Sequence, residues 1–453
     1  MISVVLDLKI MEQSRSEHIQ RERITVIDAL RGFALLGVVL VHMQQHYSIF
    51  NFGVSEPVVP LFPAMDEWVS WLTQNVLMGK FINIFAFLFG MSFFIQMDRA
   101  AQKGEDFRNR FTWRMVVLFI IGVVGSAFYT GDILSIYAFF GLILVLLYPL
   151  KNWALLLVAC LILAGAPRWI SIGYDKLKNP QRMEMSADLQ SRLSSSQMQN
   201  ALRVQPESTA SNAASTANNE ISRPHRLQDF RPQEQPEPSF WHSVRNNLTN
   251  GRENTLNYQF NQGGRGYLTF ALFILGLVVG RIRFFETVHL HRRRNAILFA
   301  GFSLGVALLN CIIRSLPQEQ GFFMRGMPST ISLVRMSLND INMVLFSAAI
   351  TMGFVVLYHV RGIGRCLDIL SPYGRMGLTN YEMQGVVGSI VFSLWGFGSV
   401  FGTWHATELF LLGIAVYASQ IVFSAVWLKY FKYGPLEWLW RSATYLKWQP
   451  FRK

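Results

Sequence analysis

The stretch "DALRGFALLGVVLVHMQQH", residues 28–46, is mostly apolar but holds Asp28 and Arg31 near one end and His42 and His46 near the other. A histidine has an ordinary pKa of about 6.5, so a neutral imidazole can accept a proton from an attacking hydroxyl or amine. An arginine guanidinium stays charged and binds phosphate oxygens through two parallel hydrogen bonds. The stretch therefore carries groups suited to proton transfer and to anion binding.

Arg31 and His42 lie eleven residues apart. In an α-helix, eleven residues return to within about 20° of the starting direction and rise about 16 Å, so both side chains are expected on one helix face. An ionisable group inside a spanning helix is costly unless it faces the protein interior, and this face therefore predicts a site. The alternative is that Arg31 pairs with Asp28 and reaches the inner interface, while His42 lies in the outer headgroup region.

Further polar residues fall near the ends of other apolar runs. Lys80 in "GKF" and Asp132 in "TGDIL" are expected at the outer ends of two helices, where they could pair with each other or contact an acceptor substrate. His46 lies one turn beyond His42, but no further cluster of ligand residues follows, so no metal site is expected.

The motif "LTNYEMQ" places several polar side chains within one apolar run. These side chains could line a channel for a donor molecule, or they could hydrogen-bond neighbouring helices; they are Asn380, Tyr381, Glu382 and Gln384. The glycines of "FILGLVVG" are expected to ease helix packing rather than to bind a nucleotide.

The elements that hold these residues are expected to be apolar helices. The chain has 453 residues, of which 51% are hydrophobic and 15% charged, a composition that a soluble fold would struggle to cover. The three cysteines show no paired spacing, so they are expected to be small core residues rather than disulfides or zinc ligands. The sequence predicts an all-α polytopic integral membrane protein with spanning helices at about 27–47, 81–97, 113–130, 132–150, 152–172, 266–282, 295–314, 340–360, 376–398 and 406–430.

Lys and Arg residues cluster on one side of the membrane under this arrangement, whereas residues 44–79 on the other side contain none. The positive-inside rule then places both termini in the cytoplasm. Membrane orientation also accounts for the net charge of +13, so the expected partner is the lipid bilayer and no nucleic acid is expected.

The expected organisation divides the chain into five parts. Residues 173–265 include "SADLQSRLSSSQMQNALRVQPESTASNAASTANNE" and are expected to form a mobile external loop. No repeat relates the two halves, so an inverted-repeat transporter is not indicated. The parts are a cytoplasmic segment (1–26), five spanning helices (27–172), the external loop (173–265), five further spanning helices (266–430) and a cytoplasmic tail rich in basic and aromatic residues (431–453).

Several sequence blocks resemble a known family. "RITVIDALRGFALLGVVLVHM", "MGKFINIFAFLFGMSFFIQMDRA", "TGDILSIYAFFGLIL", "YGRMGLTNYEMQ" and "YGPLEWLWRSATYLKWQP" occur in the order of the signature blocks of the YeiB-like family, bacterial membrane proteins of unassigned function. In its "RG" first helix and ten-helix plan, this family is similar to transmembrane acyltransferases, which use cytoplasmic acyl-CoA to modify acceptors outside the membrane.

The resemblance implies O- or N-acyl transfer, with acetyl-CoA as the expected co-substrate and a small molecule or glycan as the acceptor at the periplasmic face. It implies that His42 is the catalytic base and that Arg31 lies toward the donor phosphates. The remaining candidates are donor-binding (Asn380, Tyr381, Gln384) or acceptor-binding or structural (Asp28, Lys80, Asp132, His46). The alternatives are a transporter or exporter of a small molecule, in which the same residues pass a solute, and a scaffold protein of the envelope.

Overall fold

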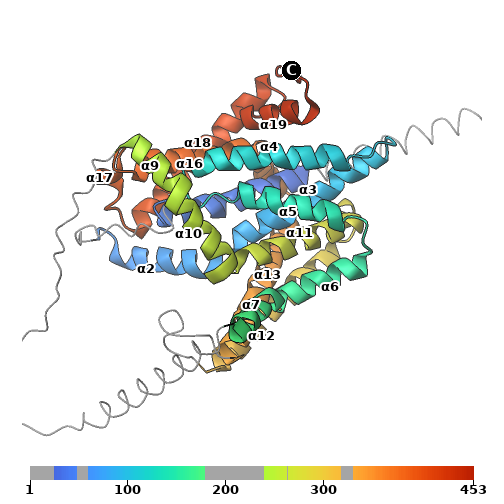
Figure 1. Cartoon of the computed structure of the whole chain (residues 1–453). Helices are drawn as coiled ribbons and strands as arrows, with labels where there is room; N and C mark the ends of the chain where they lie inside the picture. Colours follow the sequence, from blue (N-terminus) through green and yellow to red (C-terminus); the bar gives the residue numbers. More distant parts are fainter. Residues whose placement is uncertain (1–24, 48–59, 179–238, 263, 318–329) are drawn as a thin grey trace, which may run out of the picture.

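A computed structural model describes residues 25–47, 60–178, 239–262, 264–317 and 330–453 (Figure 1). The described residues are mainly helical and include no β-strand. The helices are Thr25–Gln44, α2 (Pro63–Leu72), η1 (Thr73–Leu77), α3 (Lys80–Ala101), α4 (Arg108–Ser126), α5 (Leu134–Leu147), α6 (Asn152–Leu163), α7 (Ala166–Lys178), α9 (Phe240–Asn246), η2 (Asn247–Gly251), α10 (Arg252–Asn257), η3 (Tyr258–Gln262), α11 (Arg265–Arg281), η4 (Phe284–Glu286), α12 (Arg292–Ser315), α13 (Thr330–Tyr358), α14 (Ile363–Asp368), α15 (Leu370–Arg375), α16 (Gly377–Phe392), α17 (Gly398–Phe401), α18 (Ala406–Tyr430) and α19 (Pro435–Tyr445).

Several helices are long and apolar enough to cross a membrane, which indicates a membrane protein. Two bent helix pairs, α6 with α7 and the helices of 240–260 with α11, could each form one further span. Within the described residues the count is therefore five, or up to seven with the bent pairs. The five are Thr25–Gln44, Pro63–Ala101, Arg292–Ser315, Thr330–Tyr358 and Ala406–Tyr430.

The expected layout of ten spanning helices is not reproduced, because some apolar runs are short or broken. Residues 132–150 give α5, whose 14 residues are shorter than the roughly 20 that a bilayer core requires. Residues 152–172 divide into α6 and α7, which meet at an angle of 56°. Apolar composition alone therefore does not fix the number of spans.

Helices α3 and α11 approach each other closely. A Cβ added at Gly90 would lie 2.0 Å from the carbonyl oxygen of Phe273, and one added at Gly276 would lie 2.1 Å from that of Phe87. Only glycine permits backbones to approach this closely. The packing role expected for the glycines of "FILGLVVG" is therefore confirmed at Gly276.

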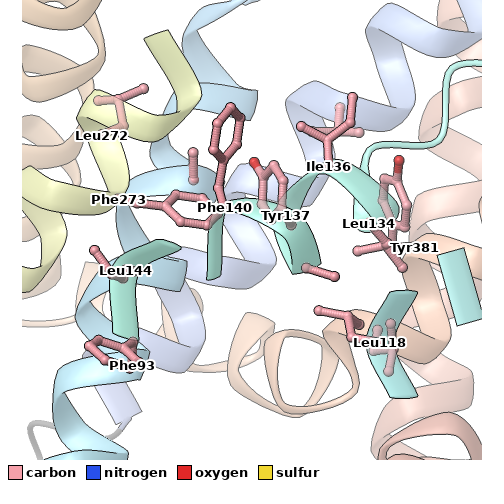
Figure 2. Close-up of a cluster of buried hydrophobic side chains, with 14 of the residues drawn as sticks. Phe93, Leu118, Leu134, Ile136, Tyr137, Phe140, Leu144, Leu272, Phe273 and Tyr381 are labelled. Atoms are coloured by element: carbon pink, nitrogen blue, oxygen red, sulfur yellow. The ribbon is translucent and has the colours of Figure 1, made fainter. Parts of the chain in front are cut away.

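Helix α5 lies in the centre of the core (Figure 2). Tyr137 is fully buried and meets the Phe273 ring edge to face, with 4.9 Å between ring centroids. Phe140 stacks on Phe270 at 5.0 Å. One face of α5 therefore packs in the core, whereas Phe139 and Leu146 on its other face are 51% and 74% exposed.

Part of the expected external loop is helical. In the described stretch from Phe240 to Gln262, Asn247 donates a hydrogen bond to the carbonyl of Ala127 (2.9 Å), and Thr255 donates one to the carbonyl of Thr130 (2.7 Å). These helices thus cover the turn between α4 and α5. The sequence does not predict this packing, because the stretch is polar. Residues 179–238 of the expected loop lie outside the described residues.

The C-terminal helix α19 packs against α4 (Figure 1). The indole of Trp440 donates to the carbonyl of Arg114, and the indole of Trp113 donates to the carbonyl of Ala443, both at 2.9 Å. The tail is therefore fastened to the bundle at two points. The cysteines, by contrast, are exposed rather than in the core: Cys160, Cys311 and Cys366 are all free thiols.

Candidate functional site

Polar residues from three parts of the chain line one pocket inside the bundle. The space between its side chains, counted together with its open mouth, is about 210 Å³. We call it the His42 pocket; it is lined by His42, Tyr47, Gly125, Tyr129, Asp132, Tyr381, Glu382 and Gly385. These residues come from the end of the first described helix, from the turn between α4 and α5, and from α16.

His42 is held between two tyrosine rings. The first helix ends at Gln44, and His46 and Tyr47 then adopt left-handed φ angles of 51° and 48°, which turn the chain back toward the pocket. The His42 ring lies 5.4 Å from the Tyr47 ring and 4.8 Å from the Tyr129 ring, between centroids. These two contacts fix the position of the imidazole between the tyrosine rings.

Two carboxyl groups also face the His42 pocket. Asp132 accepts a hydrogen bond from the backbone N–H of Leu134 at 3.2 Å through Oδ2, whereas its buried Oδ1 has no partner among the described residues. Oε1 of Glu382 is likewise buried and unpartnered in the described part of the chain. Burying such oxygens without partners is unfavourable, and it is typical of sites that bind protons or ligands.

Gly125 creates the room that Glu382 occupies. A Cβ added at Gly125 would lie 2.3 Å from Oε2 of Glu382. Tyr381, the preceding residue, lines the same pocket and accepts a hydrogen bond from the backbone N–H of Ile133 at 3.3 Å. Helix α16 therefore presents a phenol and a carboxyl group to the turn that carries Asp132.

Asn380 and Gln384 point away from the His42 pocket, into contacts between helices. The amide of Asn380 donates to the carbonyl of Tyr373 at 3.0 Å and to the hydroxyl of Ser424 at 2.9 Å. The amide of Gln384 donates to the Tyr373 hydroxyl at 2.7 Å, and that hydroxyl donates to Gln420 at 2.9 Å. Of the two roles considered for these residues, the structure favours bonding between helices α15, α16 and α18.

Arg31 lies outside the His42 pocket. Its guanidinium donates to Oδ1 of Asp28 at 2.6 Å and to Oγ of Ser92 at 2.5 Å. Leu35 and Val38, which occupy the same helix face between Arg31 and His42, are 0% and 3% exposed and belong to the apolar core. The pairing with Asp28 that the sequence suggested as an alternative is therefore present, and no described cavity joins the two ends of the helix face.

Lys80 and Asp132 do not come together. Lys80 donates to the carbonyl of Gln74 at 3.4 Å and lies 5.6 Å from the centroid of the Phe346 ring. His46 packs its ring against Phe392 at 5.2 Å and does not join His42 as a second ligand. Among the described residues, no group of three or more His, Cys, Asp or Glu side chains is placed to hold a metal ion.

Residues 279–447 match a family described as "Protein of unknown function (DUF418)". Over its C-terminal part, the chain is similar to this family. It is 29% identical to "Uncharacterized protein YxaH" of Bacillus subtilis (strain 168) over 442 residues, which cover 95% of this chain and 96% of that protein. It is 25% identical to "Uncharacterized 39.9 kDa protein in amylase 3'region" of Bacillus acidopullulyticus over 434 residues, or 94% of each chain.

The YeiB-like resemblance is also supported by a similar protein. The chain is 42% identical to "Uncharacterized protein YeiB" of Escherichia coli (strain K12) over 71 residues, which cover 16% of this chain and 18% of that protein. No solved structure matches the chain. The DUF418 match includes Tyr381 and Glu382, whereas His42 lies outside it.

The sequence does not single out two tyrosines of the His42 pocket, Tyr129 and Tyr47. Glu382 is among the polar residues of "LTNYEMQ" considered for a donor channel or for helix contacts, and the direction of its side chain depends on how α16 is rotated. Tyr129 precedes "TGDIL" by one residue and is brought in by the turn after α4. Tyr47 reaches the His42 pocket because His46 and Tyr47 adopt left-handed φ angles. The sequence gives no sign of this turn, since neither residue is a glycine.

Proposed function

We propose that this protein is an acyltransferase of the bacterial inner membrane, with both termini in the cytoplasm. It moves an acyl group, expected to be acetyl, from cytoplasmic acyl-CoA to a hydroxyl or amine of a small molecule or glycan at the periplasmic face. The observation that carries the proposal is the His42 pocket, where the imidazole shares a cavity with Asp132 and Glu382, each of which has a buried carboxyl oxygen without a partner among the described residues.

In the proposed reaction, His42 accepts the proton of the acceptor as its oxygen or nitrogen attacks the thioester carbonyl carbon. The carbon–sulfur bond then breaks, and the imidazolium returns the proton to the departing CoA thiolate. The unpartnered oxygens of Asp132 and Glu382 accept hydrogen bonds from other donor groups of the acceptor, which orients the attacking atom. Tyr47 and Tyr129 hold the His42 ring in place.

The donor phosphates are assigned to the other end of the first helix. Arg31 lies there, and Arg99 and Arg375 act electrostatically on the same Asp28 carboxyl group. Guanidinium groups suit phosphate recognition. Because Leu35 and Val38 are buried between this end and the His42 pocket, the proposal requires these side chains to separate when the acyl arm enters.

The test uses the purified full-length protein and radiolabelled acetyl-CoA with bacterial membrane vesicles as the source of acceptor. Acetyl-CoA is expected to raise the melting temperature by mass action. His42→Gln is expected to abolish label transfer while keeping that rise. His46→Gln is the matched control, since His46 lies one turn away and outside the pocket. Equal transfer by wild type and His42→Gln would overturn the proposal.

A transporter of a small molecule is a second candidate, favoured by the unpartnered carboxyl oxygens of Asp132 and Glu382. Buried acidic residues in membrane helices commonly bind a proton or a solute on its pathway. A transporter without a donor site would show no change of melting temperature with acetyl-CoA. The same measurement therefore separates the two candidates.

A further inference from the structure

A second polar pocket lies away from His42, where two bent helix pairs meet α13. It contains about 260 Å³ of space free of protein atoms and is lined by Ile162, Gly165, Pro167, Arg168, Gly264, Tyr267, Leu268 and Asp340. Its residues come from the bend between α6 and α7, from the start of α11 and from α13. None of them takes part in the reaction proposed above.

Three glycines with left-handed backbones precede the helices that start here. Gly79, Gly165 and Gly264 have φ angles of 80°, 87° and 62° and stand directly before α3, α7 and α11. The first N–H groups of a helix lack partners within the helix, and its amino end carries partial positive charge. Neither α3 nor α11 has a side-chain cap at this end.

Side chains link these helix starts to one another. A Cβ added at Gly264 would lie 3.1 Å from a guanidinium nitrogen of Arg168, and one added at Gly79 would lie 2.8 Å from a guanidinium nitrogen of Arg265. Arg265 also acts electrostatically on Lys80, the first residue of α3. The positive ends of three helices and three cationic side chains are therefore neighbours.

The charge of this cluster is only partly neutralised. We call it the Arg168 cluster; it consists of Lys80, Arg168, Arg265 and Asp340. Arg168 donates to Asp340 at 3.0 Å, but its buried Nη1 atom has no partner among the described residues. The cluster therefore holds three cations and one carboxylate. Ser337, which is 7% exposed, places a hydroxyl without a described partner against Gly165.

We propose that the Arg168 cluster binds a phosphate group. A phosphate supplies up to two negative charges, which matches the two cations that Asp340 leaves uncompensated, and its oxygens accept hydrogen bonds from guanidinium, hydroxyl and helix N–H groups. The phosphate belongs either to the headgroup of an anionic phospholipid or to a phosphorylated solute. Both present the same oxygens to the cluster.

The experiment measures binding to the delipidated full-length protein in neutral detergent. The probes are inorganic phosphate and mixed micelles that contain phosphatidylglycerol, with phosphatidylcholine as the reference lipid. Arg168→Gln and Arg265→Gln are each expected to weaken binding about tenfold or more, because each removes a charge-assisted hydrogen bond. Arg245→Gln is the matched control, because this exposed residue of α9 undergoes the same loss of charge and does not belong to the Arg168 cluster.

Asp340→Asn is expected to strengthen binding, an effect that a misfolded variant would not produce. It removes the carboxylate that competes for Arg168, so binding is expected to become tighter. Binding of phosphatidylglycerol alone identifies a headgroup site, and binding of inorganic phosphate identifies a site for a solute; both support the proposal. The proposal is overturned if neither probe binds, or if Asp340→Asn and Arg265→Gln leave the affinity unchanged.

Discussion

The two sides of α16 use polar residues in opposite ways. On one side, Asn380 and Gln384 donate hydrogen bonds to neighbouring helices. On the other side, Glu382 has a buried oxygen with no partner among the described residues and faces the His42 pocket. Polar groups within a membrane bundle hold helices together when they are satisfied, and they indicate a binding site when they are not.

The largest effect that would sharpen this contrast is expected on the pocket side. Asp132→Asn and Glu382→Gln should each lower acetyl transfer about 10- to 100-fold, because each changes a group that orients the acceptor. The melting temperature should stay the same or rise, since a neutral amide is easier to bury than a carboxylate. Transfer rates and thermal unfolding of the same preparations check both parts.

The opposite result for Glu382 would contradict the assignment of a binding role to this side of α16. If Glu382→Gln unfolds the protein while residual folded protein transfers acetyl at the normal rate, the carboxyl group is structural.

On the packing side, Asn380→Ala should lower the free energy of unfolding by about 2 kcal/mol, because it leaves the Tyr373 carbonyl and the Ser424 hydroxyl without their donor. The rise in melting temperature with acetyl-CoA should persist. Chemical denaturation in detergent measures the free energy of unfolding, and thermal unfolding with and without acetyl-CoA measures the rise. Ser424→Ala is the matched control, with an expected loss of about 1 kcal/mol from the same contact. If Asn380→Ala keeps its stability but loses the acetyl-CoA effect, Asn380 binds the donor after all.

A smaller effect is expected at Arg31, which pairs with Asp28 and is also proposed to bind the donor phosphates. Arg31→Lys keeps a charge beside Asp28 but loses the two-pronged geometry that suits phosphate. Its affinity for acetyl-CoA should fall about tenfold, or about 1.4 kcal/mol, with little change in stability without ligand. Titration of the thermal shift with acetyl-CoA tests this. An unchanged titration curve would leave Arg31 as a partner of Asp28 alone.

The smallest effect concerns Glu437, which lies in α19 and caps the start of α16. Its carboxyl group accepts the backbone N–H groups of Leu378 (2.7 Å) and Thr379 (3.0 Å). Burial raises the pKa of Glu437 above its ordinary value, so the folded state holds this proton more tightly than the unfolded state. Its contribution to stability is therefore greatest at low pH and declines as the pH rises through the folded pKa.

The prediction for Glu437 is checked by measuring how the melting temperatures of wild type and of Glu437→Gln change with pH. The melting temperature of wild type, relative to that of Glu437→Gln, should fall as the pH rises above about 4.3, the ordinary pKa of glutamate. Parallel curves for the two proteins would contradict the prediction.

The sequence predicts the helical class, the apolar elements and part of the site. His42, Asp132 and Tyr381 do share a pocket, since they lie in strongly apolar segments whose polar residues must face inward. Sequence reasoning cannot decide between the two sides of α16, because residues 380, 381 and 384 are neighbours in sequence while their surroundings depend on helix rotation. It also misses the bend at Gly165 and the helices of 240–262, where backbone geometry and a few aromatic contacts outweigh composition.

The paired indole contacts between α19 and α4 have a practical consequence. Helix α19 holds α4, and α4 is followed by the turn that supplies Tyr129 and Asp132 to the His42 pocket. A deletion that removes Trp440 would take away one of these two hydrogen bonds and uncover the surface of α4 against which α19 packs. Shortened variants of this protein should therefore keep α19.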